Sequence, residues 1–141
     1  MPTARPHAAT TLDLLDRAED ALTRGYTTTS ASARFLAASL AALRAAAAVV
    51  AARPTGTGGG PGPHDVWALT VRTAPELTEW AQRFAAATGR RVGVETGLVR
   101  VGAREADDLL RDAEVFVELV TRRLGVPAGH PPRRLAPVRS A

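Results

Sequence analysis

The chain has 141 residues, of which 45% are hydrophobic and only 4% aromatic, enough to build one core of small and medium side chains. It contains no cysteine, which excludes a disulfide framework and a thiolate metal site. All 18 basic residues are arginine; four of them (Arg5, Arg133, Arg134, Arg139) lie outside residues 8–126, which leaves 14 arginines there to balance all 14 acidic residues. The net charge of +4 therefore belongs to the ends of the chain, and the charges of residues 8–126 sum to zero.

Three segments are predicted to lack regular structure. Residues 1–9 form a short arm with two prolines, and residues 126–141 form an arginine-containing tail with four; we expect both to be disordered. Residues 54–64 are rich in glycine and proline and predict a flexible linker. Its glycines do not make a phosphate-binding loop, because that motif needs a lysine and the chain has none.

The first helix is predicted over residues 11–24, with a threonine cap at its start and Gly25 at its end. Its apolar stripe is Leu12, Leu15, Ala18 and Leu22. After a turn rich in threonine and serine, a second helix is predicted to run to about Arg53, where Pro54 stops it. We expect its main buried face to consist of Leu36, Leu40, Leu43, Ala47 and Val50, with alanine over most of the remainder.

The second helix is also about as long as a membrane span. Arg44 near its centre would cost about 2.5–3.5 kcal/mol to insert, and alanine gives little in return. The first ten residues show no apolar run typical of a signal peptide. We therefore predict a buried helix of a cytoplasmic protein that does not contact a membrane. Arg44 either extends its head to solvent or, if partly buried, needs an anionic partner.

A short helix is predicted over VWALTVR, capped by Asp65 and ended near Pro75, which suits the first turn of a further helical piece. The buried face of that piece is Leu77, Trp80, Phe84 and Ala87. Both Trp67 and Trp80 are interpreted as core anchors, although an exposed tryptophan could stack on a base. In residues 89–102, valines alternate around a central glycine, which allows a hairpin, an irregular loop or a short helical turn; we predict a loop.

The clearest pattern lies in residues 103–124, AREADDLLRDAEVFVELVTRRL. Acidic residues at its start and arginines at its end follow the charge order that a helix dipole favours. Gly125 is predicted to end this helix, as Gly25 is predicted to end the first. Its apolar residues recur at steps of three and four: Ala106, Leu109, Leu110, Ala113, Phe116, Val117, Val120 and Leu124. Together the patterns predict an all-α fold, an up-and-down bundle of four long helices over residues 10–125, with the third helix broken near Pro75.

Few side chains of this bundle suit catalysis. The histidines, His7, His64 and His130, fall in segments predicted as loops or tails, so neither a nucleophilic triad nor a histidine metal site is expected, and no cofactor is predicted. Asp108 and Asp112 lie one turn apart and could hold Mg²⁺ with a phosphate, but such residues are also typical of an acidic helix start. We predict that the two aspartates form an internal polar network with Arg44.

Three segments taken together, ASLAALRAAAAVVAA, VW...APELTEWAQRFAA and AREADDLLRDAEVFVELV, resemble an actinobacterial-type branch of the HEPN domains (higher eukaryotes and prokaryotes nucleotide-binding). The resemblance covers about residues 10–125. It implies a bundle of four or five helices that is commonly a homodimer. It also implies an active site to look for, because many HEPN domains are metal-independent ribonucleases with an R-x4-6-H motif near the start of the last long helix.

The sequence departs from that motif. Arg104 stands where the resemblance places the family arginine, but Leu109, Leu110 and Arg111 occupy the positions of the histidine. An arginine can stabilise a phosphate but cannot shuttle protons near neutral pH. We therefore expect a non-catalytic, homodimeric binding or regulatory module for RNA, a nucleotide or a protein partner, with Arg104, Arg111 and Arg100 as candidate anion contacts.

Two alternatives remain open. The domain could still be a metal-independent endoribonuclease that pairs Arg104 with an unconventional base such as Glu105 or Asp108. It could also be a helical scaffold whose groove takes only a partner helix, in which case it should have no affinity for nucleic acid at any salt concentration.

Overall fold

The computed structural model describes residues 6–54 and 65–126, with the side chains of residues 6–8 left out. All regular elements in the described part are helical: α1 (Pro6–Thr27), α2 (Ala31–Ala51), α3 (Val66–Thr73), the 3₁₀ turn η1 (Pro75–Leu77), α4 (Thr78–Gly89), α5 (Arg91–Glu95) and α6 (Ala103–Arg123). The predicted all-α fold is confirmed. The break near Pro75 is confirmed too, because η1 separates α3 from α4.

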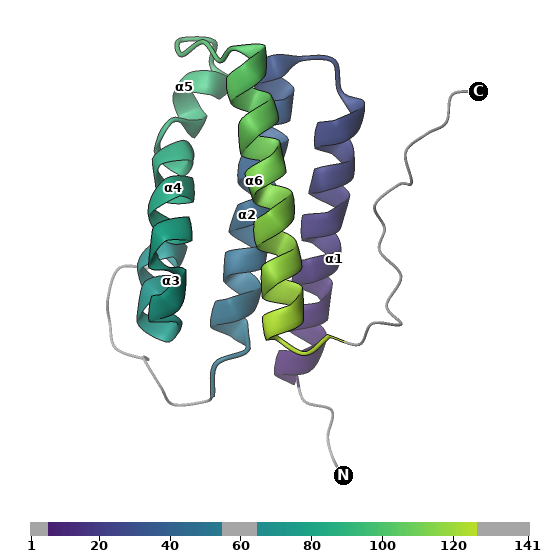
Figure 1. The fold of residues 1–141 in the computed structure, drawn as a ribbon, viewed down its shortest axis with the longest axis vertical. Coiled ribbons are helices and arrows are strands. Elements are labelled where there is room, and N and C mark those ends of the chain that lie inside the picture. The colour runs from purple at the N-terminus through teal and green to yellow at the C-terminus, as the bar shows by residue number, and fades with distance from the viewer. Residues whose placement is uncertain (1–5, 55–64, 127–141) are drawn as a thin grey trace, which may run out of the picture.

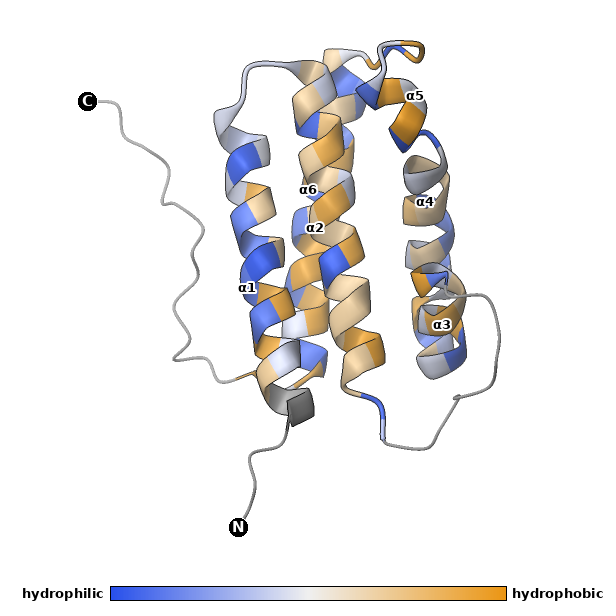
Figure 2. Ribbon diagram, turned by 180° about the vertical axis from the view of Figure 1, so that it is seen from behind, coloured by the Kyte–Doolittle hydropathy of each residue, from blue (hydrophilic) through white to orange (hydrophobic). Residues whose placement is uncertain are grey.

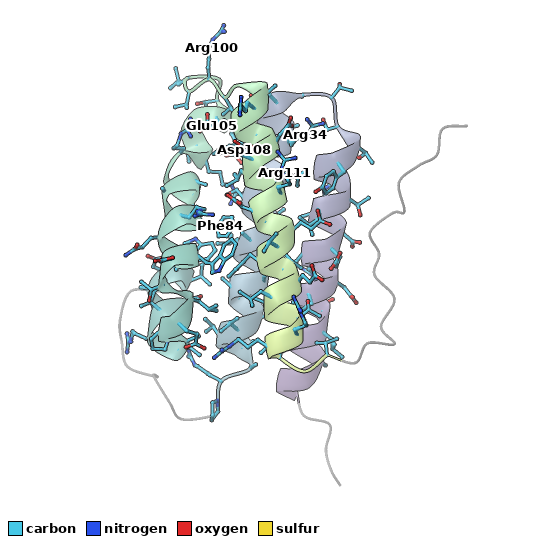
Figure 3. All side chains as sticks on the ribbon, in the orientation of Figure 1. Arg34, Phe84, Arg100, Glu105, Asp108 and Arg111 are labelled. Carbon is cyan, nitrogen blue, oxygen red and sulfur yellow. The ribbon has the colours of Figure 1, made fainter. Side chains whose placement is uncertain are left out.

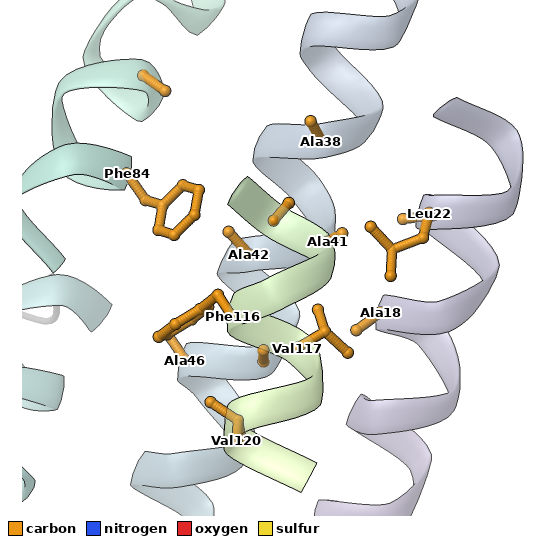
Figure 4. Close-up of a cluster of buried hydrophobic side chains, with 14 of the residues drawn as sticks. Ala18, Leu22, Ala38, Ala41, Ala42, Ala46, Phe84, Phe116, Val117 and Val120 are labelled. Atoms are coloured by element: carbon orange, nitrogen blue, oxygen red, sulfur yellow. The ribbon is translucent and has the colours of Figure 1, made fainter. Parts of the chain in front are cut away.

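The long helices alternate in direction, with α1 and α4 running one way and α2 and α6 the other, and the short α3 lies antiparallel against α4 (Figure 1). In such a bundle, α2 and α6 lie on a diagonal and run parallel. They nevertheless pack against each other at the centre, with α1 on one side and α3 and α4 on the other. This close diagonal contact is possible because α2 brings only small side chains to it, as the close-up in Figure 4 shows for Ala38, Ala41, Ala42 and Ala46.

The inner face of α2 is therefore not the one that the sequence predicted. Phe35, Val49 and a series of alanines are buried: Ala38, Ala41, Ala42, Ala45, Ala46 and Ala48. The expected core residues Leu36, Leu40, Leu43, Ala47 and Val50 are each only partly buried. The prediction was wrong because hydrophobicity alone favours leucine for the interior, whereas three neighbouring helices at short distance leave room for little more than methyl groups at most inner positions.

The first helix also differs from the prediction. It begins at Pro6, inside the arm predicted to be disordered, and continues through Gly25 to Thr27. Gly25 is buried within the helix, and a Cβ atom there would lie 2.7 Å from Cδ1 of Leu110 in α6. This glycine therefore permits close approach of α6 and does not act as a stop. The turn that follows is only residues 28–30, where Ser30 caps α2 by accepting a hydrogen bond from the Ala33 amide.

On the other side of α6, the core is aromatic. Phe84 stacks between Trp67 and Trp80, at ring-centroid distances of 5.8 and 5.9 Å. Phe116 of α6 touches all three, and lies 5.2 Å from Phe84. The buried Trp67 donates its indole N–H to Thr88 Oγ1 at 3.0 Å. Both tryptophans are thus core anchors that hold α3 and α4 on α6, as the sequence predicted.

Residues 89–102 form neither a hairpin nor only a loop. Residues 91–95 are the short helix α5, and the chain then turns at Gly97, whose φ is +79°. The Val99 amide donates to the Gly93 carbonyl at 2.9 Å, and a Cβ atom at Gly93 would lie 2.4 Å from Cγ2 of Val99. The predicted loop is therefore wrong for residues 91–95. The close return of the chain onto Gly93 is a tertiary contact that the glycine permits.

The other predictions of unstructured chain, residues 1–5, the linker from residue 55 and the tail from residue 127, lie outside the described residues. Within the described part, α2 is the one helix long and apolar enough to cross a membrane by length and composition alone. In this structure half of its most apolar window is buried against other helices.

Candidate anion-binding groove beside the start of α6

A groove of about 580 Å³ lies between α4 and the first turns of α6. Its apolar lining comes from Phe35 of α2, Ala86 and Ala87 of α4, and Leu109 of α6. Its charged lining is mixed: Arg83 of α4, Arg90 directly after α4, and Arg104, Glu105, Asp108 and Asp112 from α6. The size is in the range of small-molecule sites, which is roughly 300–1,000 Å³.

Arg83 and Arg90 are held in place by carboxylates and by aromatic rings. Arg83 pairs with Asp112 at 3.2 Å and lies 5.3 Å from the ring centre of Trp80. Arg90 pairs with Glu105 and lies 5.2 Å from the ring centre of Phe35. Each guanidinium group is therefore oriented by two contacts. The paired arginines retain N–H groups that the single carboxylate does not use.

Arg104 is different. It is exposed in the first turn of α6 and is in no ion pair within the part of the chain that the structure describes. Asp108, one turn further, pairs instead with Arg111 at 3.2 Å. The groove and its rim thus have four arginines (83, 90, 104, 111) against three carboxylates (105, 108, 112), which leaves one positive charge. Arg104 provides it, at the helix end where the dipole is also positive.

The structure brings together only some of the residues singled out by the sequence. Arg104, Asp108 and Asp112 line the groove, whereas Arg111 lies on the exposed side of α6 next to Asp108. Figure 3 shows Glu105 and Asp108 on the same part of α6, with Arg100 extending from the loop above and away from the bundle. Arg100 is exposed and does not line the groove.

The expected partnership of Arg44 with the two aspartates is not among the ion pairs found in residues 6–54 and 65–126. Helices α2 and α6 run parallel, and Arg34 pairs with Asp107 at 2.7 Å, so these two residues lie at the same height in the bundle. Arg44 is ten residues further along α2, or about 15 Å, while Asp108 and Asp112 are only about 1.5 and 8 Å beyond Asp107. Arg44 therefore lies below the level of both carboxylates.

Arg34 is the α2 arginine that does reach α6, and sequence reasoning missed it. Its Nε donates to the Gly25 carbonyl at 2.9 Å, and one terminal nitrogen donates to the Thr28 carbonyl at 2.5 Å while the other binds Asp107. One side chain thus joins the end of α1, the turn after it and the start of α6. The sequence feature that could have indicated it is the place of Arg34 in the first turn of α2. If α2 and α6 run parallel, that turn lies beside the acidic first turns of α6.

None of the residues that line the groove is a histidine. The backbone of His7 is at the beginning of α1, the end of the bundle opposite to the start of α6 (Figure 1). His64 and His130 lie outside the described residues. In residues 6–54 and 65–126, moreover, no three histidine, aspartate or glutamate side chains are gathered as metal ligands are.

Fold and groove together define a helical-bundle domain with an arginine-containing groove at the start of its last long helix. A comparison with family models is more specific: the model described as SAV_6107-like HEPN matches residues 25–121 of the 141. The chain therefore belongs to this HEPN family. No curated protein and no solved structure matches it significantly.

Proposed function

We propose that this HEPN domain is a non-catalytic binding and regulatory module, acting as a homodimer, that takes an anionic ligand, RNA or a nucleotide, in the groove beside α6. The observation that carries the proposal is the composition of the groove, which has arginines at fixed positions and no histidine among its lining residues. Such a site binds a phosphate but has no group that both accepts and donates a proton near neutral pH.

Several features of the groove support a phosphate ligand. Arg104 carries the uncompensated charge and is free to meet a ligand oxygen, while Arg83 and Arg90 are oriented beforehand by their carboxylates. Guanidinium groups match phosphate geometry because they donate two parallel hydrogen bonds. The apolar lining of Ala86 and Leu109 gives a base or sugar a surface to lie on. The groove therefore offers both parts that a nucleotide needs.

The test is fluorescence anisotropy with a labelled single-stranded RNA and a labelled mononucleotide, on the full chain at several salt concentrations. We expect Arg104→Ala to weaken binding about ten-fold. The slope of log affinity against log salt concentration should become shallower by the contribution of about one phosphate contact. Arg72→Ala is the matched control, because Arg72 is an exposed arginine of α3 that does not line the groove. Equal affinity of the wild type and the Arg104 variant would contradict the proposal.

The alternative of an endoribonuclease with a carboxylate base is tested in parallel. Both of its candidate bases, Glu105 and Asp108, line the groove near Arg104, but each is in an ion pair with an arginine. Incubation of the protein with a structured RNA, with and without a chelator, should leave the RNA intact. Cleavage that survives the chelator and disappears in Arg104→Ala would replace the first proposal by the second.

The dimer has its own measurement. Sedimentation of the full chain should give twice the mass of one chain, and a monomer at micromolar concentration would remove this part of the proposal while leaving the ligand site to be judged by anisotropy.

A further inference from the structure

The outward face of α2 is apolar along most of its length. Its partly or fully exposed apolar positions lie on one side of the helix, at steps of three, four or seven: Ala33, Leu36, Leu40, Ala47 and Ala51, with Leu43 and Val50 beside them. This stripe is about 27 Å long. Figure 2 shows α2 as a largely hydrophobic helix beside the more hydrophilic α1. Arg44 is the one charged side chain within the stripe.

The arrangement differs from that of an ordinary surface helix. Such a helix turns its large apolar residues to the core and its polar residues to water. Here most fully buried positions of α2 are alanines, whereas Leu36, Leu40 and Leu43 lie at the edge of the core, each partly packed against it and partly open to solvent. A contiguous apolar surface of this kind marks a place where another molecule binds.

The upper half of the stripe is a groove. Its floor consists of Ala33, Leu36, Ala37 and Leu40. Arg24 and Thr27 at the end of α1 form one wall, and Arg91 and Glu95 of α5 form the other. Its volume is about 500 Å³. An amphipathic helix binds to a protein in such a setting, by inserting apolar residues spaced three and four apart into a groove.

The charges around this groove select the partner. α2 has no acidic residue in its 21 residues. Glu95 is paired with Arg91 at 3.3 Å, which leaves Arg24 on one wall and Arg44 just below the floor as the charges that no other described side chain balances in an ion pair. The surface therefore presents leucines flanked by net positive charge.

We propose that the outer face of α2 is a second binding site, distinct from the groove beside α6, for an acidic amphipathic helix of a partner protein. Leucine-type residues of that helix would pack on Leu36 and Leu40, and its flanking carboxylates would meet Arg24 and Arg44. Charge complementarity of this type gives specificity and a fast association rate.

Other occupants are disfavoured by the charge of this surface. The segments of this chain outside the described residues contain no acidic residue, since all 14 lie within residues 13–118. A second copy bound by two-fold symmetry would pack the same patch, with its net positive charge, against itself. The site therefore needs a partner of opposite charge.

The experiment uses two labelled helical peptides as long as α2, with leucines on one face and either glutamates or lysines on the flanks. Anisotropy with the full chain should show binding of the glutamate peptide and at least about ten-fold weaker binding of the lysine peptide. Ala33→Glu should weaken binding of the glutamate peptide about ten-fold, because it adds a negative charge to the floor of the groove. Ala33 is exposed at the third position of α2, where a glutamate also suits the helix start, so the variant should fold.

Arg44→Ala should weaken the same peptide several-fold, whereas Val115→Glu, at an exposed position of α6 that lines neither groove, should not. Equal binding of the two peptides, or no binding of either, would overturn the proposal. So would self-association that Ala33→Glu abolishes, or binding to phosphatidylglycerol vesicles that the same variant abolishes. The result is independent of the RNA test, because Arg104→Ala should leave peptide binding unchanged.

Discussion

The two sides of α6 are held by opposite kinds of packing. Towards α1 and α2 the contact is made by alanines, with Gly25 against Leu110, so the backbones approach closely. Towards α3 and α4 the contact is made by four large rings, with Phe116 at their centre. The alanine side should be intolerant of added volume and the aromatic side intolerant of lost volume. Substitutions that change volume in opposite directions test this difference.

The largest effect is expected on the aromatic side. Phe116→Ala removes a fully buried ring that touches Trp67, Trp80 and Phe84, and should cost about 3–5 kcal/mol of unfolding free energy. Denaturant unfolding followed by tryptophan fluorescence measures it directly. Val115→Ala, at the exposed neighbouring position, is the control and should change stability by less than about 0.5 kcal/mol. A small loss for Phe116→Ala would mean that the cluster is not a structural centre.

On the alanine side, the informative change is an increase in size. Ala45→Leu adds three carbons to a fully buried position of α2 and should cost about 1–3 kcal/mol. Ala47→Leu makes the same chemical change two residues away on the outer face, and should be neutral within about 0.5 kcal/mol. Equal effects of the two variants, measured by thermal and denaturant unfolding, would refute the distinction between the inner and outer faces of α2.

The hydrogen bonds of Arg34, which join the end of α1 and the turn after it to α6, should contribute less to stability than these buried side chains do. Arg34→Ala removes hydrogen bonds to two backbone carbonyls and to Asp107, and should cost about 1–2 kcal/mol, since the guanidinium group is 22% exposed. Arg34→Lys should recover only part of this, because an ammonium group cannot reproduce the planar fork. Full stability of Arg34→Ala in urea would show that alanine packing alone positions α1 on α6.

The smallest effect on stability is expected at Arg104. Because this side chain is exposed and in no ion pair within the described part of the chain, Arg104→Ala should change the unfolding free energy by less than about 0.5 kcal/mol. The same variant that reduces RNA binding should thus melt like the wild type. A marked loss of stability would assign Arg104 a structural role and weaken the argument for a ligand there.

Much of the fold follows from local sequence. The stripe of α6 from Ala106 to Val120, the break at Pro75 and the cap at Ser30 or Asp65 depend on residues close together in the chain, so their periodicity and chemistry could be interpreted without a structure. Only part of the candidate site could be predicted from the sequence in this way. Arg104 and the aspartates stand on one helix, but Arg83 and Arg90 join them only because α4 packs beside α6.

The sequence by itself determined that this chain is a helical bundle, where most of its helices lie, and that no histidine follows Arg104 at the motif spacing. Only the tertiary structure decided which face of α2 is inside, that Gly25 is a contact and not a stop, and that Arg34, not Arg44, reaches α6. The physical reason is that periodicity reports which residues share a face, whereas the distance between helices, set by packing, decides which face fits the interior.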